Sequence, residues 1–205
     1  HKPRRRQRQM CIRDRIITFH DPNLKRITGA NITISETKFS DIRMRRLPSR
    51  ETIPTIDELL EEFPDSFFNM DLKVSHIEEK VLRKINSHNA LERVCLGSFN
   101  SRTIKKINAL EPKILTSMGI SQVIMYKFFW KKTHSKLIQI PTSRYGIKVV
   151  TKNFIDRLHK DGYKVHVWTI NSESQMQTLI DLGVDGIMTD NASGLMNVMR
   201  QNKLI

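Results

Sequence analysis

A histidine and an aspartate stand side by side in the stretch ITFHDPNLKRIT, where a short β-like run meets a proline-led basic loop. An unperturbed histidine side chain has a pKa of about 6.5, so an imidazole can donate and accept a proton near neutral pH. General acid or base catalysis requires that property. A single histidine at the last position of a strand is also commonly structural, so both interpretations stay open at this point.

A second candidate pair, Asp71 and Lys73, ends the run SFFNMDLK. A carboxylate that follows large apolar residues is costly to desolvate alone, so Asp71 requires a cation or hydrogen-bond donors. Lys73 lies two residues on and therefore on the same face of a strand. The pair is either a structural ion pair or a ligand for Mg²⁺ or Ca²⁺ beside a phosphate-binding lysine. One carboxylate is too few to hold a metal.

Further polar residues end other strand-like runs: Ser98, then Trp168 with Thr169 after VHV, and Thr189 with Asp190 near the end of the chain. Trp168 either packs in the core or forms the apolar wall of a substrate pocket. In a parallel α/β barrel, side chains from several strands converge only where strands end and loops begin. The placement of these residues therefore favours one site at that face.

The elements that must position these residues alternate from about residue 67 onward. β-rich runs are followed by segments with helical period, and Gly162 and Gly183 end two of the helices. Six strands in this alternation predict parallel pairing with crossover helices, hence an α/β sheet or barrel. The predicted strands are 66–73, 93–99, 113–118, 136–140, 163–171 and 184–192. Capping boxes are predicted at Ser75–Glu78 and Thr55–Glu58.

Two segments depart from this alternation. Residues 29–54 are polar, contain Gly29, Pro48 and Pro54, and show no sustained period, so we interpret them as an insertion after the first strand. Residues 121–135, SQVIMYKFFWKKTHS, combine aromatic residues with lysines. That segment is either a core helix or a lid that touches lipid.

The chain's 205 residues suit one domain, and its formal charge is +14. Residues 1–15 contribute +6 of that charge and show no strand or helix period, so we expect them to be non-native and exclude them from the fold. A native basic arm is the alternative. The remaining +8 in 16–205 favours an anionic partner such as a phosphate, a membrane surface or nucleic acid.

Cysteine usage and hydropathy say little about location. Cys11 and Cys95 are too few for a disulfide framework, and Cys95 is expected to be a buried thiol. No apolar run reaches the 18 residues that a membrane span requires. The compartment stays open, because any signal peptide would have been lost with the native N-terminus. Of the possible compartments, we favour the cytoplasm.

Six motifs occur in order over residues 16–200: FHDPNLKRITG, IPTIDELLEEFP, NMDLK, SFN, VHVWTIN and GVDGIMTDNA. As a set they resemble the glycerophosphodiester phosphodiesterase family. The resemblance implies a TIM barrel that hydrolyses glycerophosphodiesters to sn-glycerol 3-phosphate and an alcohol, with a divalent cation and two histidines. It assigns His20 as a catalytic histidine, Asp71 as a metal ligand, Lys73 as the lysine beside it, and Trp168 as a wall of the glycerol pocket.

The sequence departs from the family's pattern in two ways. Asp71 stands where a glutamate is more usual, which keeps the charge and shortens the side chain by one methylene. The family's H-R-G and E-x-D strands should precede ITFHD, yet residues 1–15 contain neither. We therefore expect an N-terminally truncated barrel of about six strands out of eight, with two raw edges, that binds metal poorly and turns over slowly or not at all.

Two other functions remain as alternatives. A lysophospholipase D acting at membranes fits the basic surplus and the segment 121–135. A non-catalytic module that binds anions or nucleic acid fits the charge alone, but its cations outside residues 1–15 are scattered and no aromatic stacking platform accompanies them.

Overall fold

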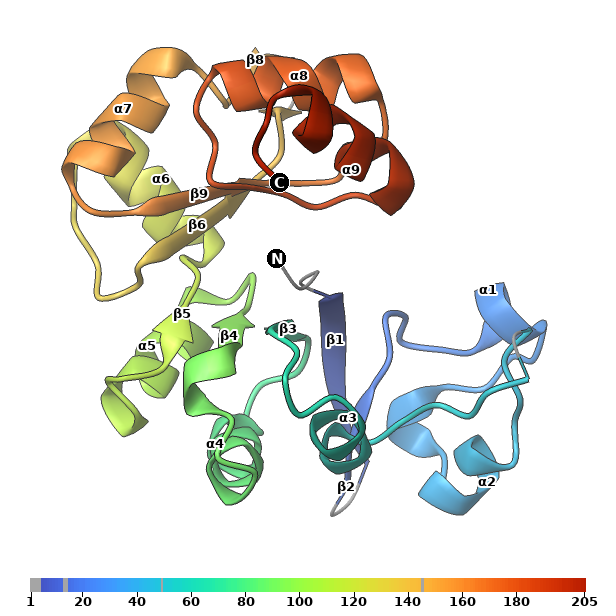
Figure 1. The fold of residues 1–205 in the computed structure, drawn as a ribbon. Coiled ribbons are helices and arrows are strands. Elements are labelled where there is room, and N and C mark those ends of the chain that lie inside the picture. Colours follow the sequence, from blue (N-terminus) through green and yellow to red (C-terminus); the bar gives the residue numbers. More distant parts are fainter. Residues whose placement is uncertain (1–4, 13–14, 49, 145) are drawn as a thin grey trace. The chain divides into compact units, whose positions relative to one another are not determined.

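The computed structural model describes residues 5–12, 15–48, 50–144 and 146–205, and the chain forms two compact units. The N-terminal unit covers Lys2–Leu115 and the C-terminal unit covers Thr116–Ile205. Strands alternate with helices in each unit (Figure 1), which confirms the predicted α/β class. Each unit has its own apolar core.

A five-stranded sheet organises the N-terminal unit, in the order β2-β1-β3-β4-β5. β3 pairs in parallel with both β1 and β4, whereas β2 pairs antiparallel with β1. Parallel pairing was predicted for the strands from residue 66 onward, and β3 with β4 confirms it; β2 precedes that series. The strands are β1 (Arg5–Ile12), β2 (Arg15–Thr18), β3 (Phe68–Leu72), β4 (Val94–Gly97) and β5 (Leu115–Thr116).

Strand β1 lies within the segment that the sequence analysis excluded from the fold. The pattern of residues 1–15 showed no alternation, yet Arg5–Ile12 pairs with β2 on one side and β3 on the other. Backbone hydrogen bonding to neighbouring strands does not require apolar alternation, so the composition of this segment could not reveal the strand. The domain boundary at residue 16 and the non-native origin of residues 1–15 remain predictions.

Of the two capping boxes predicted for helices of the N-terminal unit, one is present and one is not. Thr55 and Glu58 form the predicted capping box at the start of α3. The box predicted at Ser75 is wrong, because Ile77 occupies the N-cap of α4 and no side chain caps it. The helices are α1 (Lys25–Thr28), α2 (Phe39–Arg43), α3 (Ile56–Glu62), α4 (Glu78–Ser87) and α5 (Ser101–Leu110), with short 3₁₀ turns at Ile34–Glu36 and Leu91–Arg93.

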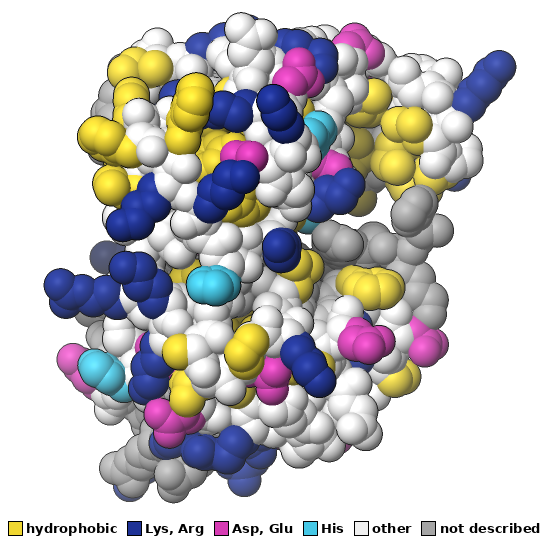
Figure 2. All heavy atoms as spheres, turned by 90° about the vertical axis from the view of Figure 1, so that its left-hand side faces the viewer, with side chains coloured by type: hydrophobic (Ala, Val, Ile, Leu, Met, Phe, Trp, Pro, Cys, Tyr) yellow, Lys and Arg dark blue, Asp and Glu magenta, His cyan; other side chains and the backbone are white. Residues whose placement is uncertain are grey.

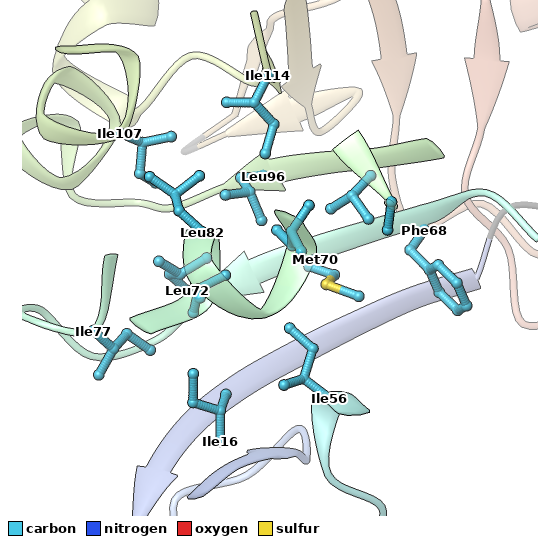
Figure 3. Close-up of a cluster of buried hydrophobic side chains, with 14 of the residues drawn as sticks. Ile16, Ile56, Phe68, Met70, Leu72, Ile77, Leu82, Leu96, Ile107 and Ile114 are labelled. Atoms are coloured by element: carbon cyan, nitrogen blue, oxygen red, sulfur yellow. The ribbon is translucent and has the colours of Figure 1, made fainter. Parts of the chain in front are cut away.

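Strand β3 carries the main core of this unit. All five of its residues are buried, and successive side chains of a strand point to opposite faces. Figure 3 shows Phe68, Met70 and Leu72 in an apolar cluster to which α3, α4 and α5 contribute. The alternate face of β3 therefore carries Asn69 and Asp71.

The segment predicted to be an insertion, residues 29–54, contains the turn Ile34–Glu36 and helix α2. Although its composition is polar, the segment contributes apolar side chains to a buried cluster. A small separate core lies beneath it, formed by Ile17, Leu24, Ile34, Ile42 and Ile53. Arg43 anchors α2 by donating hydrogen bonds to both carboxylate oxygens of Glu58, at 2.8 and 2.6 Å.

A three-stranded parallel sheet in the order β10-β9-β6 forms the base of the C-terminal unit. Helices gather around it in Figure 1, and two of them end where Gly162 and Gly183 take positive φ, as predicted. The elements are α6 (Ile120–Phe129), β6 (Leu137–Ile140), the hairpin β7 (Ser143–Arg144) and β8 (Ile147–Lys148), α7 (Lys152–Lys160), β9 (Lys164–Val167), α8 (Glu173–Asp181), β10 (Gly186–Ile187) and α9 (Ala192–Gln201).

Within the residues that the structure describes, no helix combines the length and the apolar character needed to cross a membrane. Cys95 is buried, as predicted. Cys11 lies in β1, whose side chains fall outside the description.

Candidate active site

The loops that follow β3 and β4 meet at the carboxyl ends of these parallel neighbours. The hydroxyl of Ser98 donates a hydrogen bond to the carbonyl of Leu72 at 2.9 Å. The Asn100 amide donates to the Ser75 hydroxyl at 3.4 Å, and its carbonyl oxygen caps α5 by accepting from the Arg102 amide. Ser98 is thus a structural link that fixes the two loops, rather than a reacting group.

Asp71 and Lys73 form an ion pair at this edge, as their spacing predicted. The Lys73 ammonium lies 2.6 Å from Oδ2 of Asp71, and the two side chains are only 20% and 11% exposed. Apart from this ion pair, Oδ2 of Asp71 is buried and has no hydrogen-bond partner among the described residues. A buried carboxylate oxygen with spare capacity can accept a further ligand.

Phe99 is a residue of this edge that the sequence analysis missed. Its ring, half exposed, faces the Lys73 ammonium at 4.9 Å from the ring centre. Lys73 is therefore held between a carboxylate and an aromatic face, both of which favour its charge. The signal was present in the motif SFN, which follows the neighbouring strand, but a single Phe after a strand does not reveal which cation it contacts.

His20 lies two residues beyond the end of β2, not at the last strand position that the sequence predicted. Its Nδ1 is hydrogen-bonded to Oδ1 of Asp21, and the side chain is 54% exposed. The second oxygen of Asp21 accepts a 2.6 Å hydrogen bond from Nε of Arg26. That bond from Arg26, with help from His20, lowers the pKa of Asp21, although burial opposes the shift.

This arrangement answers why a carboxylate and a cation accompany the histidine. Asp21 stays ionised because Arg26 pairs with it, and an ionised Asp21 fixes a proton on Nδ1 of His20. Nε2 is then the ring atom at which the neutral imidazole accepts a proton and the imidazolium releases one. The pair of groups can therefore orient a proton-transferring histidine.

The sheet register relates His20 to Asp71 in an unexpected way. Thr18 at the end of β2 and Leu72 at the end of β3 both pair with Gln9 of β1. The two strands run in opposite directions on either side of β1, but their carboxyl ends reach the same level of the sheet. Asp71 lies within β3, opposite Arg8, and the chain beyond Thr18 runs toward the amino end of β3. The parallel-neighbour argument, which predicted that His20 and Asp71 lie at one edge, therefore does not apply to β2.

Trp168 belongs to the C-terminal unit, where it directly follows β9. The loops after β9 and β10 are joined there by Asn171, whose side-chain oxygen accepts hydrogen bonds from the Thr189 hydroxyl at 3.1 Å and the Asp190 amide at 2.9 Å. Its amide donates to the Asp190 carboxylate at 3.2 Å. Asn171 was not predicted, because nothing in a single asparagine indicates that it joins two loops.

The resemblance implies a divalent cation, which requires several oxygen ligands. Asp71 offers a carboxylate oxygen of the right chemistry. The described part of the chain contains no group of three or more His, Cys, Asp or Glu side chains placed to hold a metal. Asp71 alone does not make a metal site, so no chemical step is derived through a metal.

A surface hollow of about 470 Å³ lies elsewhere in the N-terminal unit. It includes none of the predicted site residues and lies over the segment after β2. Its lining consists of Ile32, Thr37, Asp41, Met44 and Arg45. The hollow therefore does not mark the candidate site.

The fold is shared with solved structures of phosphodiesterases. A phosphodiesterase of Oleispira antarctica, solved in complex with the product sn-glycerol 3-phosphate, superposes with a TM-score of 0.76 at 21% identity, over 95% of this chain and 84% of that one. The α/β fold of this chain is thus shared with a solved phosphodiesterase.

The sequence pattern of the glycerophosphoryl diester phosphodiesterase family matches residues 13–193, and the chain belongs to this family of hydrolases. A glycerophosphodiester phosphodiesterase of Bacillus altitudinis is 28% identical over 195 residues, which cover 86% of this chain and 77% of that protein. The lysophospholipase D GDPD1 of Homo sapiens is 26% identical over 221 residues, which cover 86% and 70% of the two chains.

Proposed function

We propose that the protein hydrolyses glycerophosphodiesters to sn-glycerol 3-phosphate and an alcohol. The observation that carries the proposal is the family match over residues 13–193. The ion pair of Asp71 and Lys73 at the carboxyl end of β3 supports it, since a strand end that presents a cation suits a phosphate substrate. The test is release of sn-glycerol 3-phosphate from glycerophosphocholine by the purified chain.

For the architecture, we propose that the strands of both units belong to a (β/α)₈-type barrel, with residues 29–54 inserted after β2. The TM-score of 0.76 to the Oleispira enzyme over 95% of the chain supports this proposal. The number of barrel strands, about six, stays a prediction.

Lys73 is proposed to bind the phosphodiester. Its ammonium, only partly exposed, compensates the negative charge that grows on the phosphoryl oxygens in the transition state. Asp71 and Phe99 hold it in place, so little reorganisation is required when the substrate arrives. Asp71 is also the residue proposed as a ligand for Mg²⁺ or Ca²⁺.

His20 is proposed as the general acid that protonates the leaving alcohol oxygen. Proton transfer operates only in the transition state, so His20→Ala should lower kcat by about 10²–10⁴-fold and change KM little. Steady-state assays of sn-glycerol 3-phosphate release measure both constants. His88→Ala removes a histidine of α4's C-cap that bonds to Asp57 in α3, and is the matched control. Equal losses of kcat in the two variants would remove His20 from the mechanism.

The remaining assignments are proposals of the same kind. Trp168 is proposed to contact the glycerol part of the substrate, and its indole offers the apolar face that such a contact uses. The substrate is proposed to be a small molecule, with nucleic acid disfavoured. A cytoplasmic location stays a prediction.

A second candidate activity is lysophospholipase D at a membrane. The human relative, which carries that name, favours it. Parallel assays with glycerophosphocholine and lysophosphatidylcholine separate the two activities. A higher kcat/KM for the lysophospholipid would replace the first proposal by the second.

A further inference from the structure

Three successive aromatic residues at the end of helix α6 are exposed to solvent. Phe128, Phe129 and Trp130 are 69%, 71% and 67% exposed, and Ile124 and Met125 one turn earlier are also exposed. Large apolar side chains gathered at one place on a protein surface commonly mark a site of interaction. In Figure 2, hydrophobic side chains lie next to Lys and Arg side chains on the face that bears α6 and α7.

The core-helix interpretation of residues 121–135 does not account for these side chains. Within α6 only Gln122 and Tyr126 are buried. Tyr126 anchors the helix by donating to the Asp161 carboxylate at 2.8 Å and by packing edge-on against Tyr163, with ring centres 5.2 Å apart. The helix is thus held by one face, and its last turn contributes its aromatic rings to the surface.

Trp130 takes an unusual backbone conformation to end the helix. Its φ of +53° is left-handed, a conformation that favours glycine and strains a bulky side chain. The ring lies 5.4 Å from the Arg157 guanidinium, yet two thirds of the residue stays exposed. Core packing therefore does not explain an indole at this position, whereas a contact outside the molecule does.

The sequence around this helix end is rich in cations. Residues 116–155 contain seven Lys and Arg residues and no Asp or Glu. Residues 156–205 contain five Lys and Arg residues and six Asp and Glu residues. Lys131 and Lys132 directly follow the aromatic residues and are exposed. The Lys132 ammonium also forms an ion pair with Oδ1 of Asp161 at 2.7 Å, which holds Lys132 in place.

We propose that residues 128–132, the aromatic–basic segment, form a docking surface for an anionic lipid membrane. Phe and Trp side chains partition into the headgroup region of a bilayer, and adjacent lysines are attracted to anionic headgroups. A second copy of the chain is disfavoured as the occupant, because two surfaces with this excess of cations would repel each other. Charge complementarity therefore selects the anionic membrane.

The aromatic–basic segment lies at the amino end of β9. It therefore does not cover the residues that follow the carboxyl end of this strand. Lys132 contacts Asp161, and the Thr133 amide donates to the Tyr163 hydroxyl at 2.9 Å, both just before β9 begins. Trp168 lies beyond the other end of β9. Docking would thus turn this unit's strand ends away from the bilayer, which, given the proposed function, favours a water-soluble glycerophosphodiester as substrate.

Sedimentation with vesicles tests the docking. The full chain should bind vesicles of phosphatidylcholine with about 30% phosphatidylglycerol, because anionic headgroups attract the lysines, and should bind pure phosphatidylcholine weakly. F128S/F129S/W130S should lower the partition coefficient by at least about ten-fold. Met44→Ser, at a position that is 74% exposed in the other unit, is the control and should bind as the wild type.

Fluorescence gives a second readout. The chain has two tryptophans, so Trp168→Phe leaves Trp130 as the only indole. Its emission should shift to the blue with anionic vesicles and be quenched by brominated lipid, and about 0.5 M salt should weaken both effects. No shift, or wild-type binding by the triple variant, would overturn the proposal.

Two further measurements keep the outcomes apart. A triple variant that becomes monomeric in sedimentation while the wild type is a dimer would assign the segment to a copy–copy contact and overturn the lipid proposal. Turnover of soluble glycerophosphocholine should be unchanged in the triple variant. Loss of vesicle binding with intact turnover supports docking, whereas absence of turnover in the wild type refutes only the proposed function.

Discussion

Two aspartates, each paired with a lysine near a strand end, have different surroundings. Asp71 at the carboxyl end of β3 has a buried oxygen that contacts Lys73 and has no hydrogen-bond partner among the described residues. Asp185 directly precedes β10, and its oxygens accept from Lys164 at 2.8 Å, from His159 at 2.7 Å and from the Val165 amide at 2.8 Å.

The difference separates a carboxylate that holds the fold from one that can bind a ligand. Asp185 joins the start of β9, the end of α7 and the start of β10, and its acceptor positions are occupied. Asp71 has capacity left at the end of the sheet where substrates of α/β enzymes bind. Similar residues thus differ in how completely the backbone and side chains around them satisfy their oxygens.

The largest expected effect comes from removing the charge of Asp71. Asp71→Asn should lower kcat/KM for glycerophosphocholine by at least about 10²-fold, because Lys73 loses the partner that positions it and the ligand oxygen loses its charge. Asp185→Asn makes the same chemical change and should alter kcat/KM by less than about two-fold. Similar activity losses in the two variants would break the comparison.

Stability should show the reverse order. Asp185→Asn should lower the free energy of unfolding by about 1–2 kcal/mol, because the hydrogen bonds from Lys164, His159 and the Val165 amide are weakened at a partly exposed site. Urea denaturation followed by circular dichroism measures it. Glu62→Gln removes one negative charge from an exposed position and is the control, expected to change little. An unchanged midpoint for Asp185→Asn would show that its hydrogen bonds do not stabilise the fold.

The pH dependence of stability sharpens the role of Asp185. Burial raises its pKa, but hydrogen bonds from Lys164, the Val165 amide and His159 outweigh burial and lower the pKa below its ordinary value. Because the folded pKa is depressed, the stabilisation is present above the unfolded value of about 3.9 and is lost as pH falls through the folded pKa.

The stability gap between the wild type and Asp185→Asn should therefore be constant from about pH 5 upward and shrink below about pH 4. Urea midpoints measured from neutral pH down into this range test it. A gap that widens in acid would have the wrong sign for a depressed pKa.

The smallest effect is expected at Phe99. Phe99→Leu removes the aromatic face next to Lys73, a contact worth about 0.5–1 kcal/mol, so KM should rise about two- to five-fold with a smaller change in kcat. Phe99→Tyr keeps an aromatic face and should restore wild-type constants. If Leu and Tyr behave alike, the ring does not position Lys73.

The sequence predicted local features wherever one residue type carries the information. Gly162 and Gly183 end helices because a left-handed residue is required there, and Thr55 with Glu58 forms its capping box within four residues. The ion pair of Asp71 and Lys73 follows from the two-residue period of a strand and the cost of burying one charge. These predictions involve only neighbours in sequence.

Predictions that depend on distant partners were less successful. Ser75 met every local criterion for a cap, yet the chain enters α4 through Ile77, because the cluster beneath α4 buries that residue. Strand β1 could not be found because it lacks apolar alternation and because one of its two partners, β3, lies far along the chain. The sequence also left the exposure of the aromatic–basic segment undetermined, since the same residues are compatible with a buried core helix.

The sequence by itself therefore determined the family, the alternation of strands and helices, and the residue types that could transfer a proton or bind a phosphate. Tertiary structure alone decided that β2 runs antiparallel to β1, that Phe99 faces Lys73 and that Arg26 holds Asp21 beside His20. The physical reason is that periodicity and backbone preferences act between neighbouring residues, whereas strand order, ring contacts and spare hydrogen-bond capacity depend on which distant segments pack together.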